Sequence, residues 1–134
     1  MIVDSSAVAA ILFREPDGER FAVALRDATV IRISAATLVE VAMVVVSRLG
    51  PNGALQLERL LKRLDVVVEP FTGLQAGTAH AGWLRFGRGR HRAALNFGDC
   101  FAYALAIERD EPLLFSGADF ARTDVRCALN STTP

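Results

Sequence analysis

Short apolar segments alternate with longer helical patterns along this chain of 134 residues, and this alternation constrains the fold more than any other feature. The apolar segments cover residues 2–3, 30–33, 66–68 and 113–115. Strands that alternate with helices in this way form parallel sheets, with the connecting helices on both faces. We therefore expect one α/β/α sandwich domain over residues 1–134, with a mostly parallel sheet of four to five strands.

Helical patterns fill the intervals between these segments. The expected helices cover residues 5–13, 16–25, 34–48, 52–64, 72–86 and 97–109. The uninterrupted valines of segment 66–68 indicate a buried strand, and a fifth strand is expected near Val125. In parallel sheets of this kind, ligands bind at the carboxyl ends of the strands, where the strand order reverses. Residues that follow a strand are therefore the first candidates for a functional site.

The charge balance excludes one class of function. Fifteen basic and fifteen acidic residues give a net charge of zero, which excludes a polycationic protein that binds nucleic acid through bulk charge. An acid stands at position 4 with no basic segment before it, and the run Val41–Val46 is too short to span a bilayer. We expect a cytoplasmic protein without membrane association. Cys100 and Cys127 are expected to be reduced thiols; a single disulfide between them is the alternative.

Three aspartates occur at or near places where a parallel sheet would bind a ligand. Asp4 and Asp119 each follow an apolar segment, and Asp99 lies in the first turn of a helix. Each also has a purely structural explanation, as a helix cap, a turn residue or, with Asn96 as the cap, a residue that complements the helix dipole. That explanation does not account for Gly98, because glycine is expected where another group approaches the backbone closely. Asp124 ranks second to Asp119, since it lies farther from the strand end.

Glu40 is the unusual acid, because it lies within the apolar helix pattern of residues 35–46. An exposed position at the helix edge is the alternative, but it would bring apolar neighbours such as Met43 and Val44 into water. A half-buried carboxylate must pair, bind a metal or take up a proton. Several carboxylates at one edge of a sheet cannot all stay ionised without a cation, and Mg²⁺ or Mn²⁺ suits oxygen ligands. The hydroxyl of Ser6 is expected to brace a carboxylate or to cap a helix.

These residues and their spacing resemble the PIN-domain family, and within it the VapC-type toxins of toxin–antitoxin pairs. The resemblance covers essentially the whole chain and is carried most specifically by two segments, Gly89–Cys100 and Pro112–Phe120. It implies that Asp4, Glu40, Asp99 and Asp119 form the family's metal-binding, catalytic acidic quartet, with the hydroxyl of Ser6 in support. Asn96, as the cap beside Asp99, is a further supporting candidate. Ser116 stands where relatives often have lysine.

The resemblance implies a small α/β fold and a Mg²⁺-dependent endoribonuclease, with Mn²⁺ as a substitute ion. It also implies a homodimer that is neutralised by a small VapB-like antitoxin. An amphipathic antitoxin segment would find apolar surface on the helices between residues 16 and 64, unless those side chains form the core. The side chains concerned are Phe21, Leu25, Leu57 and Leu61.

A basic segment precedes Asp99, and no acid lies between Glu69 and Asp99. Arginine binds phosphate through its forked donors, so this segment is either a phosphate-binding loop for RNA or a solvated loop. Trp83 and Phe86 are more consistent with core packing than with base stacking. The RNA-binding candidates are Arg85, Arg88, Arg90, His91 and Arg92.

Two other functions remain open from the residues alone. A phosphatase or phosphoacceptor domain would need a second acid two residues after Asp4, where this chain has Ser6. A non-catalytic module that binds RNA or protein would not need the full set of acids.

Overall fold

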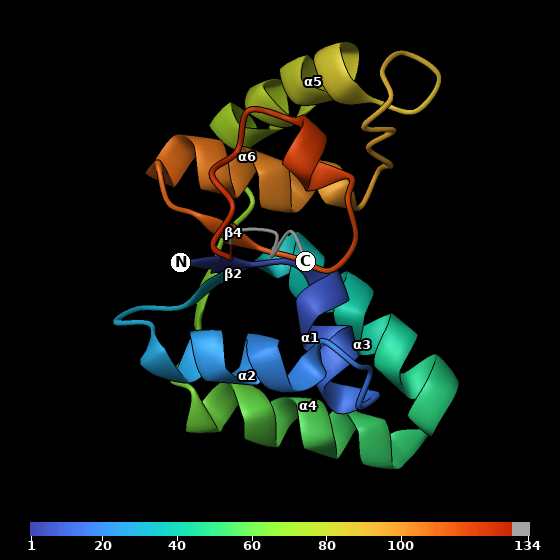
Figure 1. Cartoon of the computed structure of the whole chain (residues 1–134), viewed down its shortest axis with the longest axis vertical. Coiled ribbons are helices and arrows are strands. Elements are labelled where there is room, and N and C mark those ends of the chain that lie inside the picture. The colour runs from blue at the N-terminus through green and yellow to red at the C-terminus, as the bar shows by residue number, and fades with distance from the viewer. Residues whose placement is uncertain (130–134) are drawn as a thin grey trace.

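The computed structural model describes residues 1–129, which fold around a central four-stranded sheet (Figure 1). The strands are β1 (Ile2–Val3), β2 (Arg32–Ser34), β3 (Val67–Glu69) and β4 (Leu113–Leu114). The helices are α1 (Ser5–Leu12), α2 (Gly18–Asp27), α3 (Ala35–Leu49), α4 (Pro51–Arg63), α5 (Gly73–Phe86), α6 (Asp99–Arg109) and the short 3₁₀ helix η1 (Phe120–Arg122). The predicted alternation of strands and helices is confirmed.

The sheet is parallel throughout, with the strand order β3-β2-β1-β4. Ile2 pairs with Arg32 on one side and with Leu113 on the other. The chain therefore leaves β1 outward through β2 to β3 and returns to β4 on the opposite side of β1. The strand order reverses between β1 and β4, so the carboxyl ends of these two strands border the crevice where such folds bind ligands.

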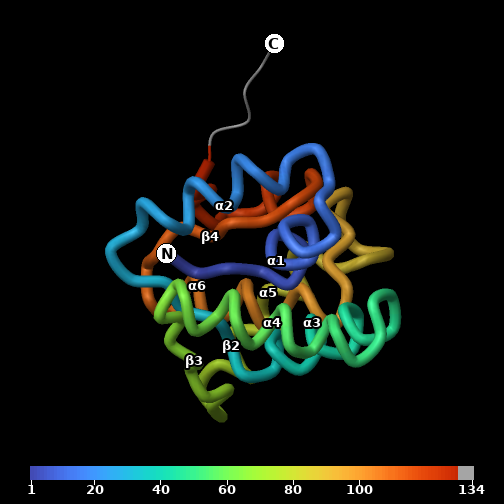
Figure 2. The backbone as a smooth tube through the Cα atoms, turned by 90° about the horizontal axis from the view of Figure 1, so that it is seen from below, coloured from blue at the N-terminus to red at the C-terminus, as the bar shows by residue number. Residues whose placement is uncertain are grey.

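Helices cover both faces of the sheet, as predicted. Helices α5 and α6 lie on one side, and α1 to α4 lie on the other (Figure 1). Seen from below, α2 lies near β4 and α4 lies beside α3 (Figure 2). Because side chains alternate along a strand, Ile2 and Leu113 pack toward α6, whereas Val3 and Leu114 pack toward α1 and α2. Full burial of such an aliphatic side chain contributes about 1.5–3 kcal/mol.

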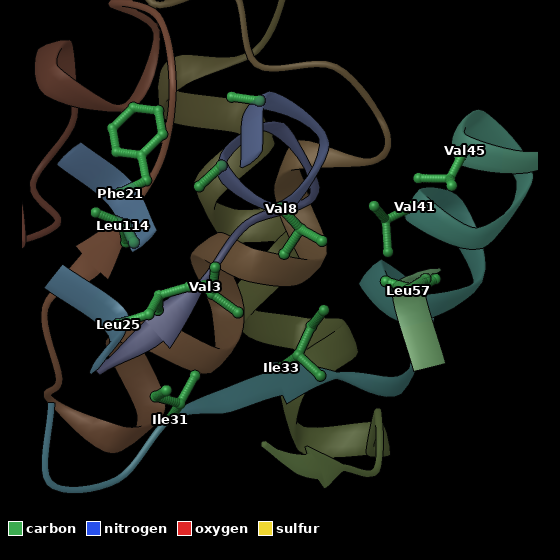
Figure 3. Packing of buried hydrophobic residues seen from close by; sticks show 12 residues of the cluster. Val3, Val8, Phe21, Leu25, Ile31, Ile33, Val41, Val45, Leu57 and Leu114 are labelled. Carbon is green, nitrogen blue, oxygen red and sulfur yellow. The ribbon is translucent and has the colours of Figure 1, made fainter. Parts of the chain in front are cut away.

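The larger core lies between the sheet and α1 to α4 (Figure 3). Phe21, Leu25 and Leu57 belong to it and are each at most 5% exposed, while Leu61 is half-buried against it. These side chains are therefore intramolecular core, and the alternative that they offer free surface to an antitoxin is wrong for the three buried ones.

Three local predictions differ from the structure. Strand β3 is not buried, since Val67 and Val68 are 40% and 47% exposed; β3 is an edge strand that pairs only with β2. The strand expected near Val125 is reduced to a single parallel bridge between Leu113 and Cys127. Helix α6 begins at Asp99 rather than Phe97, because a cap made by Asn96 holds the preceding turn.

Cys100 is a buried cysteine and Cys127 a half-buried one, and the structure does not join them in a disulfide. Among residues 1–129, none of the helices combines the length and the apolar character that a membrane crossing requires.

Candidate active site

Asp4 directly follows β1, at the reversal of the strand order. Its side chain caps α1, because Oδ2 accepts hydrogen bonds from the backbone N–H and the hydroxyl of Ser6, at 3.0 and 2.6 Å. Asp4 is only 2% exposed, yet Oδ1 has no hydrogen-bond partner within residues 1–129. A buried oxygen without a partner is costly to maintain. The capping role is thus confirmed for one oxygen, and it leaves the other oxygen available to a ligand.

Ser6 connects the two strands that border the crevice. Its hydroxyl donates to Asp4 Oδ2 and accepts a hydrogen bond of 3.0 Å from the backbone N–H of Ser116, which follows β4. The carboxylate of Asp4 is therefore fixed relative to the end of β4. The predicted bracing role of the Ser6 hydroxyl is confirmed.

Glu40 lies on α3 and is half-buried, as predicted. Ser5 donates a hydrogen bond of 2.6 Å to Glu40 Oε1. The other oxygen, Oε2, lies so close to Gly98 that a Cβ atom on that residue would overlap it. Gly98 is therefore the residue that another group approaches, as predicted. Ser5 was missed by the sequence interpretation, although its position directly after Asp4 was a usable signal.

The neighbours of Glu40 are less buried than the sequence pattern indicated. Met43 and Val44 are 65% and 43% exposed, so the expectation that they would be kept from water is wrong. The reason is that α3 turns one apolar face toward the core through Val41 and Val45 and a second apolar face toward solvent.

Asp99 and Asn96 form a reciprocal cap at the start of α6. Asp99 Oδ2 accepts from the backbone N–H of Asn96, and Asn96 Oδ1 accepts from the backbone N–H of Asp99, both at 2.9 Å. Burial raises the pKa of Asp99, and the charges of Asp119 and Glu40 raise it further, against the hydrogen bond from Asn96 and the charge of Arg88. The structural role of Asp99 is therefore real, and it coexists with repulsion from other carboxylates.

Four carboxylates act on one another here, and we call Asp4, Glu40, Asp99 and Asp119 the acidic site. Burial raises the pKa of Asp4 to about 6, the charges of Asp99 and Glu40 add to the increase, and the Ser6 hydrogen bonds oppose it. Asp119 is exposed at the start of η1, and its negative charge raises the pKa of Asp99. The four predicted acids are thus linked by pairwise electrostatic interactions, with Asp119 linked through Asp99.

The side chains of the acidic site are of the chemical type that binds hard divalent ions. Its ligand atoms are carboxylate oxygens, and the buried Asp4 Oδ1 lacks a partner. Within residues 1–129, no three Asp, Glu, His or Cys side chains stand close enough together to enclose an ion. Mg²⁺ usually takes one or two protein carboxylates and keeps several waters, so an open arrangement of this kind fits it.

The basic segment is divided between the acidic site and the protein's own surface. The charge of Arg88 acts on Asp99. Arg85 forms an ion pair of 3.1 Å with Asp124, and Arg90 donates to the carbonyl of Leu84 at 3.1 Å. Among the five basic candidates, Arg88 is therefore the one tied directly to the acids.

The two remaining basic candidates make mainly local contacts. His91 Nδ1 accepts a hydrogen bond from the backbone of Ala93, and its ring packs edge-on against Phe86. Arg92 is exposed, and its carbonyl accepts a hydrogen bond from Arg122.

Asp124 is occupied elsewhere. Its Oδ1 accepts a hydrogen bond of 2.9 Å from the hydroxyl of Tyr103, and its Oδ2 pairs with Arg85. Burial and the bond to Asp124 raise the pKa of Tyr103 to about 12. Asp124 is therefore a structural partner of Tyr103, and its lower rank is justified. Phe86 is 8% exposed, which confirms its role in core packing.

Comparisons with known proteins identify sequences and folds that are similar to this chain. The model of the PIN domain family matches residues 1–126. Ribonuclease VapC28 of Mycobacterium tuberculosis is 49% identical over 131 residues, which cover 97% of this chain and 98% of the relative. Ribonuclease VapC of Mycolicibacterium smegmatis is 45% identical over 125 residues, or 93% and 97% of the two chains.

Solved structures share the fold at low sequence identity. VapC20 of Mycobacterium tuberculosis, described as a toxin that cleaves the sarcin–ricin loop, has a TM-score of 0.75 at 20% identity, over 92% of this chain and 95% of that chain. VapBC2 of Rickettsia felis, bound to a promoter DNA fragment, has a TM-score of 0.74 at 15% identity, over 94% of each chain.

Proposed function

The chain belongs to the PIN-domain family, and because it matches VapC ribonucleases over nearly their whole length, we propose that it is a Mg²⁺-dependent endoribonuclease. The single observation that carries the proposal is the acidic site itself, which lies at the strand-order reversal. The charges of Asp99 and Glu40 act on Asp4, the charges of Asp119 and Glu40 act on Asp99, and Asp4 Oδ1 has no partner within residues 1–129. Mn²⁺ is expected to replace Mg²⁺.

Each acidic residue has a defined part in this proposal. Asp4 and Asp99 would be the strongest ligands, Glu40 the next, and Asp119 would act at longer range or through water. When bound, Mg²⁺ supplies a water of lowered pKa and positive charge near the scissile phosphate. Ser6 and Ser5 keep the carboxylates of Asp4 and Glu40 in place by hydrogen bonding.

The basic side chains contribute substrate binding. Arg88 lies close enough to influence Asp99 and so would neutralise a phosphate that approaches the acids. Arg92, which is exposed, would contact the RNA backbone farther away. Arg85 and His91 are held by contacts within the protein, and their part in binding would be smaller.

Substitution of Asp99 tests the activity. We expect Asp99→Asn to abolish Mg²⁺-dependent RNA cleavage and toxicity on expression, while circular dichroism shows an intact fold, because asparagine can still cap α6. Asp27→Asn is the matched control, since Asp27 is an exposed acid at the end of α2. RNA cleavage by Asp99→Asn at the wild-type rate would refute the assignment.

The phosphatase alternative is tested with the same preparations. Ser6 occupies the position where such an enzyme needs a second acid, and its hydroxyl is already used by Asp4 and Ser116. Hydrolysis of a small aryl phosphate without RNA cleavage would favour the phosphatase.

We further propose that the protein acts in the cytoplasm as the toxin of a type II toxin–antitoxin pair, as a homodimer that a small VapB-like antitoxin neutralises. Its likeness to one chain of the VapBC2 complex supports an antitoxin partner. An exposed apolar stripe on α3 supports a dimer, because Val39, Met43 and Val46 recur at helical spacing and are 59%, 65% and 42% exposed. We expect Met43→Glu to convert the dimer into a monomer in light scattering; an unchanged mass would move the interface elsewhere.

A further inference from the structure

An aromatic groove lies between α5 and α6, with a volume of about 440 Å³. Phe97 contacts Phe101 edge-on at 4.9 Å between ring centroids, and Phe101 contacts Phe71 in the same way at 4.8 Å. The rings of His80 and Trp83 lie almost parallel, with an angle of 13° between them. We call this the aromatic groove; five rings and three small side chains line it, namely Phe71, His80, Trp83, Phe97, Phe101, Ala76, Ala79 and Cys100.

The groove adjoins the acidic site through the start of α6. Phe97 lies two residues before Asp99, and Cys100 follows Asp99 directly. Phe97 is 81% exposed, so core packing does not account for a phenylalanine at this position. A ligand that covers the ring of Phe97 therefore lies against the turn that leads into α6, the helix that begins with Asp99.

Positive charge lies along the same region. The guanidinium of Arg90 lies over the ring of Trp83, 5.1 Å from its centroid, and the charge of Arg88 acts on Asp99. The sequence has no acid between Glu69 and Asp99. The groove thus offers flat apolar rings for stacking beside arginines that suit a phosphate backbone.

We propose that the aromatic groove binds one unpaired base of the RNA substrate and thereby places a neighbouring phosphate at the acidic site. The base must be unpaired because stacking on protein rings requires a base that has left its helix. This inference rests on the proposed ribonuclease function and adds a recognition step to it. A dimer does not require the aromatic groove, because a second copy of the chain can bind the separate apolar stripe of Val39, Met43 and Val46 on α3.

The single tryptophan gives a binding signal that does not depend on cleavage. In the Asp99→Asn background, we expect a short single-stranded RNA to quench the fluorescence of Trp83. Replacing the bases of that RNA one at a time by hydrogen should identify one position whose loss removes the quenching and weakens binding by about 5- to 100-fold, the effect expected for one stacked base.

Variants at Phe97 then locate the site. In the active protein, Phe97→Ala should lower kcat/KM for the intact RNA by about 5- to 100-fold and cause no further loss on the RNA that lacks the critical base. Phe97→Tyr should retain activity and Phe97→Leu should lose it, which separates stacking from simple apolar contact and from misfolding. Leu74→Ala is the matched control, because Leu74 is a 73% exposed apolar residue of α5 outside the groove.

The two proposals fail in different ways. If RNA is cleaved in an Asp99-dependent manner but Phe97→Ala behaves like Leu74→Ala, the base site is refuted and the ribonuclease function stands. If no RNA is cleaved but the base-dependent quenching of Trp83 persists, the ribonuclease function is refuted and the base site stands. If Phe97→Ala instead breaks a dimer or abolishes antitoxin binding, with RNA binding unchanged, the groove belongs to a protein partner and the base site is refuted.

Discussion

Two groups of carboxylates lie near the sheet, and they are treated in opposite ways. Around Arg32, at the start of β2, every carboxylate has a cation. Arg32 pairs with Glu69 and Glu111 at 2.9 Å each, Arg109 pairs with Glu69 at 3.0 Å, and the amino group of Met1 pairs with Glu111 at 2.6 Å. We call these residues the Arg32 cluster. In the acidic site, by contrast, the charges that act on Asp4 and Asp99 are mainly those of other carboxylates.

The pKa shifts have opposite signs in the two groups. Burial acts to raise the pKa of Glu111, but hydrogen bonds from the Met1 amino group and from Arg32 outweigh it and lower the pKa. Burial raises the pKa of Asp4 to about 6, and its acidic neighbours add to the increase. A carboxylate that is paired with cations of the protein stabilises the fold. A buried carboxylate without such a partner lowers stability unless a bound cation balances its charge.

The largest effect is expected from Asp4→Asn, which should change activity and stability in opposite directions. Loss of a residue that only hydrogen-bonds a metal ligand typically lowers activity about 10- to 100-fold. Because Asp4 would be a ligand itself, RNA cleavage by Asp4→Asn should fall by more than that. In EDTA at pH 7, the variant should be more stable than the wild type by up to about 3 kcal/mol, because the buried charge is removed. Urea unfolding and RNA cleavage measure the two effects.

The sign of the stability change can be checked by pH. The folded pKa of Asp4, about 6, is above its ordinary value of 3.8, so stability is fully present below about pH 4 and is lost as the pH rises through about 6. The metal-free wild type should therefore become less stable from pH 4 to pH 7, and Asp4→Asn should flatten this dependence. An equally steep dependence in both proteins would contradict the pKa assignment.

A smaller effect is expected from Gly98→Ala. The backbone of Gly98 is helical, with φ of −64°, so alanine fits locally, but its Cβ atom would displace Glu40 Oε2. Cleavage should fall about 10- to 100-fold, as for other disturbances of a ligand's surroundings. In a Glu40→Ala background, Gly98→Ala should have no further effect; additive losses would show that Gly98 acts through something other than Glu40.

The smallest effect on cleavage is expected from Arg32→Ala. Removal of Arg32 leaves Glu111 with the Met1 amino group and Glu69 with Arg109, so the melting temperature should fall. The activity per folded molecule should be unchanged, because within residues 1–129 the ion pairs of the Arg32 cluster include no residue of the acidic site. Arg92→Ala, which removes an exposed arginine, should leave the melting temperature unchanged. A specific loss of activity in Arg32→Ala would break the distinction between the two groups.

Local signals in the sequence predicted most of the fold and the four acids. Asp4, Glu40 and Asp99 could be selected because each stands next to a strand end, an apolar helix face or a helix start. Even the approach of a group to Gly98 was predictable, although its identity as Glu40 was not. The exposure of β3 and the pairing of Asp124 with Tyr103 depend on contacts between distant segments, which no local pattern encodes.

The basic segment shows the same limit. The five basic residues within residues 83–92 could be recognised from the sequence. Their contacts could not, since Arg88 acts on Asp99, Arg85 pairs with Asp124 and Arg90 donates to the carbonyl of Leu84. The aromatic groove is likewise assembled from separate segments of the chain. The sequence therefore contains no sign that Trp83 and Phe97 line the same groove.

The central claim is that the unmatched acidic site holds a divalent cation, and calorimetric titration of the metal-free protein with Mn²⁺ tests it most directly. We predict saturable binding to the wild type and its loss in Asp4→Asn, with Asp27→Asn binding as the wild type does. Absence of binding to the wild type, or equal binding to Asp4→Asn, would contradict the account.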